Sequence, residues 1–441
     1  MNDVASRPTA HQGLKRLLLA LLFALLLLPA LQAKFGFAKL AALGGYSEPA
    51  PRADFSTEAL LNNTFQTGLE KYLEDRIGFR EWMIRLRNQL AYSLFKLGRA
   101  NNTVVGEDDI LFDGNAIDTD LGKNFVGEQV VARNVRRLRD VQDTLARHGT
   151  LLVFAIAPGK SGVYRDQQPA YYRRQAAQRS TYAAYAEKMA AAGVNVLDYG
   201  ALFRQWRHTS KYPIFPRGGI HWSLYGRDLA VDTLFGYLRQ HGRPNFPDTR
   251  MRSIELSKEP RDTDNDIAKA LNLFREPEAF LMAYPNLEFK PLSPGQRKPN
   301  VLLIADSFGY GLVPYLPAVV SQESRFWYYN ELVAWAGTGE PPEGNQVRAL
   351  DLRSQLHGRD VVLLLYTEPN LLTFDHGFID NAYQLFHPYS EAENAQIKRI
   401  EEQLQADTTV ANRVWRQSYK DNIDPKAIFY REARAIFDKE R

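Results

Sequence analysis

Ser307 follows the apolar run in "VLLIADSFGYG" (301–311) and stands directly before a glycine-containing turn. In an open parallel sheet, functional side chains gather where strands end, because the loops converge over that edge. A helix entered through this turn would present backbone amides to a developing oxyanion. Ser307 is therefore a candidate nucleophile, and the alternative is a small residue that only ends a strand.

A serine hydroxyl needs a base, and we favour His221 in "FPRGGIHWSLYGRDLA" among the eight histidines. It lies in a glycine-rich turn before an expected helix, where an imidazole can be both exposed and held in position. His376 in "TFDHGF" is a second candidate. We do not expect Asp375 to orient the His376 ring, because neighbours in an extended chain point to opposite faces.

The elements that could position these residues follow from the alternation of apolar runs with amphipathic stretches. We expect strands at 150–158, 194–198, 300–306 and 360–366, and helices at 130–148, 182–192, 223–239 and 347–356. Near-continuous apolar strands separated by helices are typical of a parallel sheet covered on both faces. The expected fold class is α/β, a three-layer domain with a central parallel sheet.

Outside this alternation the pattern is less regular. We expect helices from Ser56 and again over 76–98, and short strands at 102–106 and 110–114. Residues 244–299 are expected to hold long loops with one helix near 267–273. The last fifty residues are charged and amphipathic, which indicates helices rather than a terminal sugar-binding β-sandwich.

The N-terminus carries a basic region followed by an apolar one. Lys15 and Arg16 precede "LLLALLFALLLLPALQA" (17–33), and no further charge occurs before Lys34. This pattern is typical of a segment that enters a membrane with its positive end in the cytoplasm. A signal peptide cleaved after Ala33 and an uncleaved anchor both fit, and we favour the anchor because apolar residues continue beyond it. The rest of the chain is then expected outside the cytoplasm.

We therefore divide the chain into four parts. They are a cytoplasmic tip with the anchor or signal peptide (1–45), a helical region (46–100), the α/β domain (101–390) and a helical tail (391–441).

Composition restricts partners and chemistry. With 55 basic and 51 acidic side chains, the formal charge of +4 is too small to indicate nucleic-acid binding. Cysteine is absent, which excludes disulfides, thiol nucleophiles and thiolate metal sites. We expect no metal and no other cofactor.

Several stretches, taken in order, resemble the SGNH-hydrolase-like domain of the alginate O-acetyltransferase proteins. They are "RIGFREWMIRLRNQL", "APGKSGVYRDQQP", "HWSLYG", "ADSFGYG" and "YTEPNLLTFDHGFIDNA", within about residues 60–390. In that family the histidine block precedes the serine block, which is the reverse of ordinary SGNH esterases. This chain has the reversed order.

The resemblance implies a periplasmic O-acetyltransferase that acts on an exported or cell-surface polysaccharide. Ser307 would carry the acetyl group as an acyl-enzyme, and His221 would act as base and then as acid. A membrane-bound O-acyltransferase is the implied partner, and the N-terminal helix would hold the chain in the inner membrane. The alternatives are a carbohydrate acetylesterase and an inactive scaffold that binds polysaccharide or docks an acyltransferase.

One position departs from the family pattern. Members with demonstrated chemistry carry an aspartate two residues before the histidine, where this chain has Gly219. That acid orients the imidazole, and its loss from a serine triad lowers the rate by about four orders of magnitude. Asp264 and Asp266, on the loop-rich segment between His221 and Ser307, are the candidates to replace it. Their alternative role is to cap the helix that follows.

Further residues are expected to bind the oxyanion or the substrate. By the family resemblance, the amide of Phe308 or of the serine itself contributes to the oxyanion site. Asn330 and Asn370 are candidates for a polar side chain there, with a role in turns as the alternative. Trp222, beside the histidine, and Lys160, in the matching stretch "APGKSG", are expected near the substrate.

Overall fold

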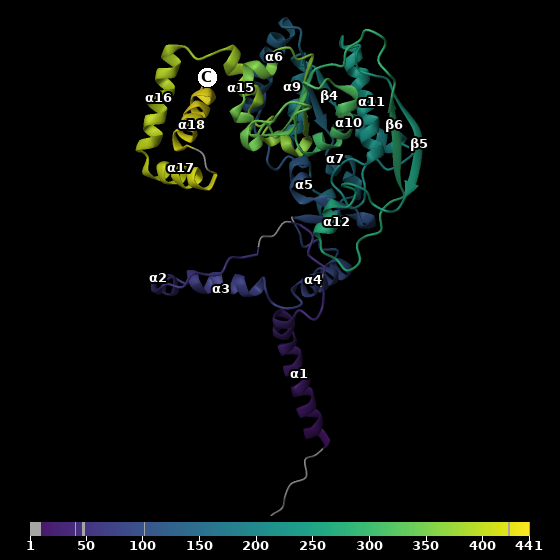
Figure 1. The fold of residues 1–441 in the computed structure, drawn as a ribbon, viewed down its shortest axis with the longest axis vertical. Coiled ribbons are helices and arrows are strands. Elements are labelled where there is room, and N and C mark those ends of the chain that lie inside the picture. Colours follow the sequence, from purple (N-terminus) through teal and green to yellow (C-terminus); the bar gives the residue numbers. More distant parts are fainter. Residues whose placement is uncertain (1–9, 40, 46–48, 101, 422–423, 441) are drawn as a thin grey trace, which may run out of the picture.

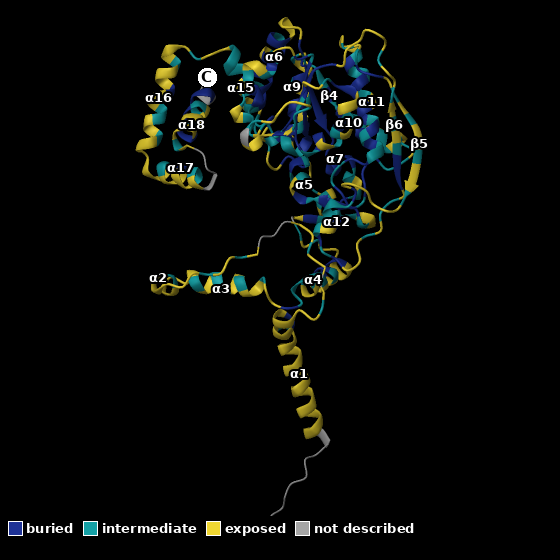
Figure 2. Ribbon diagram, viewed as in Figure 1, coloured by how far each residue is buried: buried dark blue, intermediate teal, exposed yellow. Residues whose placement is uncertain are grey.

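The computed structural model describes residues 10–39, 41–45, 49–100, 102–421 and 424–440. The expected cytoplasmic tip falls on residues 1–9, which lie outside the described residues. Figure 1 shows a helix α1 (Ala10–Phe35) that projects alone, a large α/β core, and a helical C-terminal part beside the core. Burial follows the same division, because the core is largely buried whereas α1 is exposed except near its C-terminal end, where Gln32 is buried (Figure 2).

Among the described residues, six strands form the central sheet, in the spatial order β4, β3, β10, β7, β8, β9. Their bounds are β3 Leu151–Ala157, β4 Val196–Asp198, β7 Val301–Ala305, β8 Arg325–Tyr328, β9 Leu332–Trp335 and β10 Val361–Thr367. Neighbours from β4 to β8 run parallel, and β9 runs antiparallel to β8 at one edge. The expected α/β sheet is confirmed, with an antiparallel edge strand added to it.

Side chains of the central strands alternate between two cores. In β7, Val301, Leu303 and Ala305 contribute to one core, and Leu302 and Ile304 contribute to the other. β3 and β10 alternate in the same way, and β10 is buried along its whole length. Burial on both faces explains why these strands are almost continuously apolar.

Helices cover both faces of the sheet, which completes the three layers. One core packs under α10 (Tyr199–Thr209), α11 (Leu224–Gln240) and α13 (Leu316–Val319). The other packs under α6 (Glu128–Arg147), α9 (Thr181–Ala191), α14 (Leu352–Leu356) and α15 (Phe378–Phe386). The short elements are α5 (Gly114–Asp120), α7 (Lys160–Val163), α8 (Ala170–Arg173) and the antiparallel pair β1 (Thr103–Val105) and β2 (Leu111–Asp113).

The region between α1 and the core contains α2 (Thr57–Leu61), α3 (Thr64–Glu74) and α4 (Arg80–Phe95) (Figure 1). The turn before α4 contacts the end of α1 so closely that a Cβ on Gly78 would lie 2.7 Å from the Cβ of Gln32. α4 also packs on the core, where the Asn88 side chain donates to the carbonyl of Leu271 at 2.7 Å. The helix segment Gln12–Phe35 is long and apolar enough to cross a membrane.

The structure corrects the expectation of mainly loops over residues 244–299. That region holds a long antiparallel hairpin of β5 (Thr249–Ser257) and β6 (Met282–Phe289). Much of the hairpin is exposed, so its sequence lacks the apolar runs that marked the central strands. The helix between the two strands is α12 (Asp266–Ala270), which begins one residue earlier and ends sooner than expected.

Two further expectations need correction. The expected helix over 347–356 is a 3₁₀ turn, Val347–Ala349, followed by the short α14. The strands β8 and β9 were not expected, because each has four residues and a tight turn joins them. In that turn Tyr329 and Asn330 have φ values of 51° and 56°, the left-handed pair that suits a two-residue hairpin turn.

From residue 391 on, the described chain is helical: α16 (Glu391–Ala406), α17 (Thr408–Asp421) and α18 (Pro425–Glu440). α16 and α18 share a small apolar core. The buried Arg137 of α6 forms ion pairs with Asp380 of α15 at 2.8 Å and with Asp438 of α18 at 3.1 Å. These ion pairs join α18 to the α/β core.

Leu364 of β10 is fully buried, at 0% exposure. We expect Leu364→Ala to lower the free energy of unfolding by about 2–5 kcal/mol, through lost burial and a residual cavity. Leu256→Ala removes the same atoms from β5 at 46% exposure, and we expect a change below about 1 kcal/mol. Urea denaturation followed by tryptophan fluorescence measures both variants. Equal losses would contradict the position of β10 at the centre of the core.

Candidate active site

Asp306 joins the ends of two central strands beside the candidate nucleophile. It is fully buried between β7 and the 3₁₀ turn Ser307–Gly311. Its Oδ1 accepts from the Phe308 amide at 3.0 Å, and its Oδ2 accepts from the amide and the hydroxyl of Thr367, both at 2.7 Å. The Asn370 side chain donates to the same Oδ2 at 2.7 Å. Asp306 therefore fixes the turn at Ser307 relative to the loop after β10.

His221 lies within hydrogen-bonding distance of the candidate nucleophile. Its Nε2 is 2.9 Å from the Oγ of Ser307. The chain enters α11 just beyond it, where the Ser223 hydroxyl caps the helix by accepting from the Gly226 amide at 3.0 Å. The rings of His221 and Phe308 lie 4.9 Å apart between centroids. The helix cap and the ring contact together hold the imidazole over the turn.

Asp266 extends this contact into a chain of hydrogen bonds. Its Oδ2 lies 2.7 Å from the Nδ1 of His221, and its Oδ1 accepts from the amides of Ile220 and Ile267 at 3.1 and 2.7 Å. A carboxylate accepts, so the imidazole proton lies on Nδ1 and Nε2 is left to accept from the Ser307 hydroxyl. The arrangement has the geometry of a nucleophile, a base and an orienting acid.

Gly219 lacks a side chain for a steric reason. A Cβ at this position would collide with the carbonyl oxygen of Thr263 and would lie 3.0 Å from the carbonyl carbon of Asp264. The Ala268 amide also donates to the Gly218 carbonyl at 3.0 Å. The backbone before His221 thus lies directly against the segment that leads into α12 and carries the acid.

Asp264 takes no part in this hydrogen-bond chain, which corrects one of the two sequence candidates. Its carboxylate accepts from the Tyr284 hydroxyl at 2.7 Å and from the Arg261 amide at 3.1 Å. Burial raises the pKa of Asp264. The hydrogen bond from Tyr284 lowers it, but by less than burial raises it. The side chain closes the turn before α12 and fastens it to β6.

Lys160 supports the turn before His221. Its Nζ donates to the carbonyls of Arg217 and Gly219 at 2.9 and 2.8 Å. Burial lowers the pKa of Lys160 to about 7, while the charge of Asp266 acts in the opposite direction. A neutral amine has two N–H donors, and both have an acceptor here. The amine therefore orders the backbone of the site, although substrate contact was expected for it.

Two hollows meet at Ser307. The first, about 220 Å³, has Lys160 and Asn370 in its wall, and we call it the Asn370 hollow. The second, about 250 Å³, has His221 and Arg227 in its wall, and we call it the His221 hollow. Because Ser307 lines both, a group bound to its hydroxyl can be reached from either side.

Trp222 and Phe308 form the apolar part of the site. They are 5% and 4% exposed, and their rings meet edge to face with centroids 5.0 Å apart. The Phe308 amide donates to Asp306 and is not free for an oxyanion, contrary to one expectation. The Ser307 amide donates no hydrogen bond within the described part of the chain, so it is the backbone donor that remains.

The two asparagine candidates lie in different surroundings. Asn370 lines its hollow, and its Nδ2 also lies 3.3 Å from the Tyr329 hydroxyl. Asn330 lies in the β8–β9 turn, its side chain donates to the His376 carbonyl at 3.1 Å, and it lines neither hollow. The left-handed backbone at Asn330 favours this residue type. Asn330 is therefore a turn residue.

His376 is not placed to serve Ser307. Its ring lies against Tyr329 and Tyr366, with centroids 4.6 and 5.7 Å apart, and its Nε2 is 3.0 Å from the Thr373 hydroxyl. Burial lowers the pKa of the His376 ring. The residue contributes to the packing of the loop after β10.

Asp306 and Thr367 belong to the site but were missed in the sequence. Asp306 directly precedes the candidate serine, and that adjacency was the available signal. Thr367 carried none, because a threonine at a strand end is common. Within the described residues, no three His, Asp or Glu side chains form a group that could hold a metal ion.

Comparisons with known proteins confirm the resemblance seen in the motifs. Residues 103–313 match the family model described as SGNH hydrolase-like domain, acetyltransferase AlgX. The probable alginate O-acetylase AlgJ of Azotobacter vinelandii is 28% identical over 189 residues, or 41% of this chain and 46% of that protein. The protein of the same name from Pseudomonas aeruginosa is 28% identical over 185 residues, or 41% and 44%. The chain thus matches about half the length of these curated relatives.

Two solved structures are also similar. The O-acetyltransferase domain of Pseudomonas putida AlgJ has a TM-score of 0.41 and 20% identity, and the match covers 64% of this chain and 99% of that one. Pseudomonas aeruginosa AlgX has a TM-score of 0.41 and 16% identity, with 66% and 70% covered.

The contact of the Gly219 backbone with Thr263 and Asp264 leads to a prediction. Gly219→Ala is expected to displace the segment before α12 and to lower the free energy of unfolding by about 1–3 kcal/mol. Hydrogen exchange at the Ile220 amide should become faster, because its acceptor Asp266 moves away. Gly236→Ala, in α11 with no atom closer than 3.8 Å to the new Cβ, is the matched control and should stabilise slightly. Unchanged exchange at Ile220 in Gly219→Ala would contradict the packing.

The lowered pKa of Lys160 predicts a pH dependence. The folded chain releases this proton near pH 7, whereas the unfolded chain holds it up to about pH 10. Between these values the unfolded state binds more protons, so stability rises with pH by up to about 1.4 kcal/mol per unit. Lys160→Met has no ionisable amine at this position and lacks this pH dependence. The free energy of unfolding of the parent chain should therefore grow relative to that of the variant from pH 7.5 to 9.5. Urea denaturation across this range measures the difference, and parallel curves would refute it.

Proposed function

We propose that the chain is an extracytoplasmic O-acetyltransferase that modifies an exported or cell-surface polysaccharide through a serine acyl-enzyme. The observation that carries this proposal is the continuous hydrogen-bond chain from Asp266 through His221 to Ser307, at 2.7 and 2.9 Å. The match to an SGNH hydrolase-like acetyltransferase domain supports the same reaction class.

In the first half-reaction, the Oγ of Ser307 attacks the carbonyl carbon of an acetyl ester or thioester. His221 takes the hydroxyl proton at Nε2, and Asp266 stabilises the imidazolium that forms. The Ser307 amide stabilises the negative charge on the carbonyl oxygen. Asn370 Nδ2 adds a second donor only if it turns to the oxyanion the N–H that now faces the Tyr329 hydroxyl at 3.3 Å, because its other N–H donates to Asp306. The bond to the leaving group then breaks, and His221 returns the proton to that group.

In the second half-reaction, a sugar hydroxyl takes the place of the leaving group. His221 removes its proton, and the sugar oxygen attacks the acetyl-serine carbonyl. Collapse of the intermediate forms the sugar ester and restores the Ser307 hydroxyl with the proton from His221. The same three residues therefore serve both halves.

The two hollows indicate from which side of Ser307 each reacting group approaches. Donor and acceptor oxygens must both approach His221, because it gives the proton to one and takes it from the other. The His221 hollow, with Arg227 and Asp262 in its wall, suits them. The Asn370 hollow then receives the carbonyl oxygen of the acetyl group.

An acetylesterase remains the second candidate, since water can take the position of the sugar hydroxyl. An inactive scaffold was favoured by Gly219, which leaves the usual acid position empty. Asp266 weakens that alternative, because it lies at the imidazole nitrogen that an orienting acid must face.

We further propose that α1 holds the chain in the inner membrane with the core in the periplasm. The apolar segment Gln12–Phe35 supports a membrane location. A membrane-bound O-acyltransferase would then be the source of acetyl groups at the membrane surface. By analogy with relatives named as alginate O-acetylases, an acidic polysaccharide such as alginate is the acceptor to test first. The mechanism runs through an acyl-serine and needs no cofactor.

Three variants test the proposal with a chromogenic acetyl ester. Ser307→Ala should reduce ester cleavage to background, because the acyl-enzyme cannot form. Asp266→Asn should lower kcat by about 10²- to 10⁴-fold, because the imidazole loses its orienting acid. Asp264→Asn, whose side chain contacts Tyr284 instead, is the control and should stay within about threefold of the parent. Equal losses in the Asp264 and Asp266 variants would refute the assignment of the acid.

Mass spectrometry of alginate oligomers incubated with the ester and the full chain separates the alternatives. Acetylated oligomers that are absent with Ser307→Ala support the transferase. Free acetate without acetylated oligomers favours the esterase. A parent chain inactive in both assays favours the scaffold.

A further inference from the structure

A polar hollow lies at the edge of the sheet opposite Ser307. The loops before β7, β8 and β10 and the loop after β9 form a hollow of about 340 Å³ there. Arg325, at the start of β8, and Arg359, just before β10, lie in its wall, and we call it the arginine hollow. The length of β7, Val301–Ala305, separates it from Ser307 by about 15 Å.

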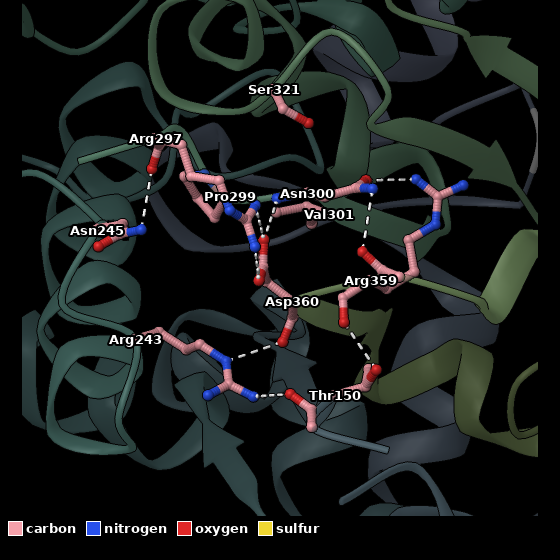
Figure 3. A network of polar contacts seen from close by, with 12 residues as sticks. Thr150, Arg243, Asn245, Arg297, Pro299, Asn300, Val301, Ser321, Arg359 and Asp360 are labelled. Carbon is pink, nitrogen blue, oxygen red and sulfur yellow. Dashed lines mark hydrogen bonds and ion pairs between the residues drawn. The ribbon is translucent and has the colours of Figure 1, made fainter. Parts of the chain in front are cut away.

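Arg359 is held in place by neutral acceptors. Its Nη1 donates to the side-chain oxygen of Asn300 at 2.6 Å and to the carbonyl of Glu323 at 2.7 Å (Figure 3 shows the contact with Asn300). Its Nε donates to the carbonyl of Gln355 at 2.6 Å. Burial, and then the positive charge of Arg325, lower the pKa of Arg359 to about 10. The charge of Glu323 acts on this pKa in the opposite direction, but the guanidinium itself is held by neutral acceptors and not by an ion pair.

The nearby acids do not neutralise this pair. Asp360 accepts two hydrogen bonds from Arg297, both at 2.7 Å, and one from the backbone N–H of Asn300 at 2.6 Å (Figure 3). Glu323 borders the arginine hollow, is exposed, and accepts from the Asn300 side chain at 3.1 Å. Within the described residues, neither acid forms an ion pair with Arg325 or Arg359.

The side chain of Arg325 has no hydrogen bond or ion pair in the part of the chain that the structure describes, and its Nη1 is buried without a partner. A buried N–H donor without an acceptor is unfavourable, and more so on a charged group. Arg325 and Arg359 therefore place two positive charges at one hollow, whose wall holds a single carboxylate, Glu323, that forms an ion pair with neither of them.

We propose that the arginine hollow binds an oxyanion, the carboxylate or phosphate group of a small polar ligand. Guanidinium groups present paired N–H donors that match two oxygens of such a group. The wall adds hydroxyl and amide groups from Thr338, Ser354 and Gln355, which suit a hydroxyl-rich ligand such as an acidic sugar unit. The site does not depend on the chemistry at Ser307.

Thermal unfolding of the full chain in detergent tests the site, with phosphate compared against chloride at equal ionic strength. Phosphate should raise the Tm of the parent more than chloride does. Arg325→Gln should lose this extra rise without unfolding in chloride, because the Arg325 side chain makes no hydrogen bond or ion pair with the described residues. Arg353→Gln, on the exposed side of α14 and outside the hollow wall, should keep it. No extra rise in the parent, or an equal rise in Arg325→Gln, would overturn the proposal.

Calorimetric titration distinguishes the two sources of the oxyanion. If an acidic sugar is the ligand, an alginate trisaccharide should bind at least about tenfold more tightly than phosphate, and a neutral trisaccharide should not bind. If free phosphate is the ligand, the order is reversed. The phosphate binding, or the part of the alginate binding that belongs to this hollow, should vanish with Arg325→Gln, while cleavage of the chromogenic ester stays at the parent rate. Phosphate binding that survives in Arg325→Gln, or an alginate titration identical in the parent and in Arg325→Gln, would overturn the site.

Discussion

The candidate site depends on the close approach of two backbones, at Gly219 and at the segment 263–266. The approach leaves no room for a side chain at 219, and it brings the carboxylate of Asp266 to the imidazole of His221. The missing acid and its replacement are thus two consequences of one packing contact. Lys160 strengthens the same contact from the other side, because its amine donates to the Gly219 carbonyl.

The fold could be predicted where burial leaves a trace in composition. β7 and β10 are buried on both faces, so their sequences are nearly all apolar, and the helices over them are amphipathic. The β5–β6 hairpin leaves no such trace, because water covers much of it and its exposed positions, apart from Leu256, are polar. The four-residue strands β8 and β9 depend on the neighbouring β7 for their pairing, which a local pattern cannot reveal.

Only those site residues could be predicted whose neighbours in the sequence mark them. Ser307 at a strand end and His221 before a helix are marked by their neighbours in the chain. The choice between Asp264 and Asp266 is set by how one loop folds against another, since the two residues share the same local sequence. The same holds for the asparagines: Asn370 follows the central β10, whereas Asn330 takes the left-handed turn between strands that were not foreseen.

α4 connects the apolar helix to the candidate site, because the turn before it contacts α1 at Gly78 and its side packs on Leu271, just beyond α12. With α1 in a bilayer, as proposed, this connection would keep the candidate site at a fixed distance from the lipid surface. Under the proposed function, the polysaccharide would then be met in a layer next to the membrane. The degree of acetylation along a polysaccharide chain would depend on how long each part of it stays in that layer.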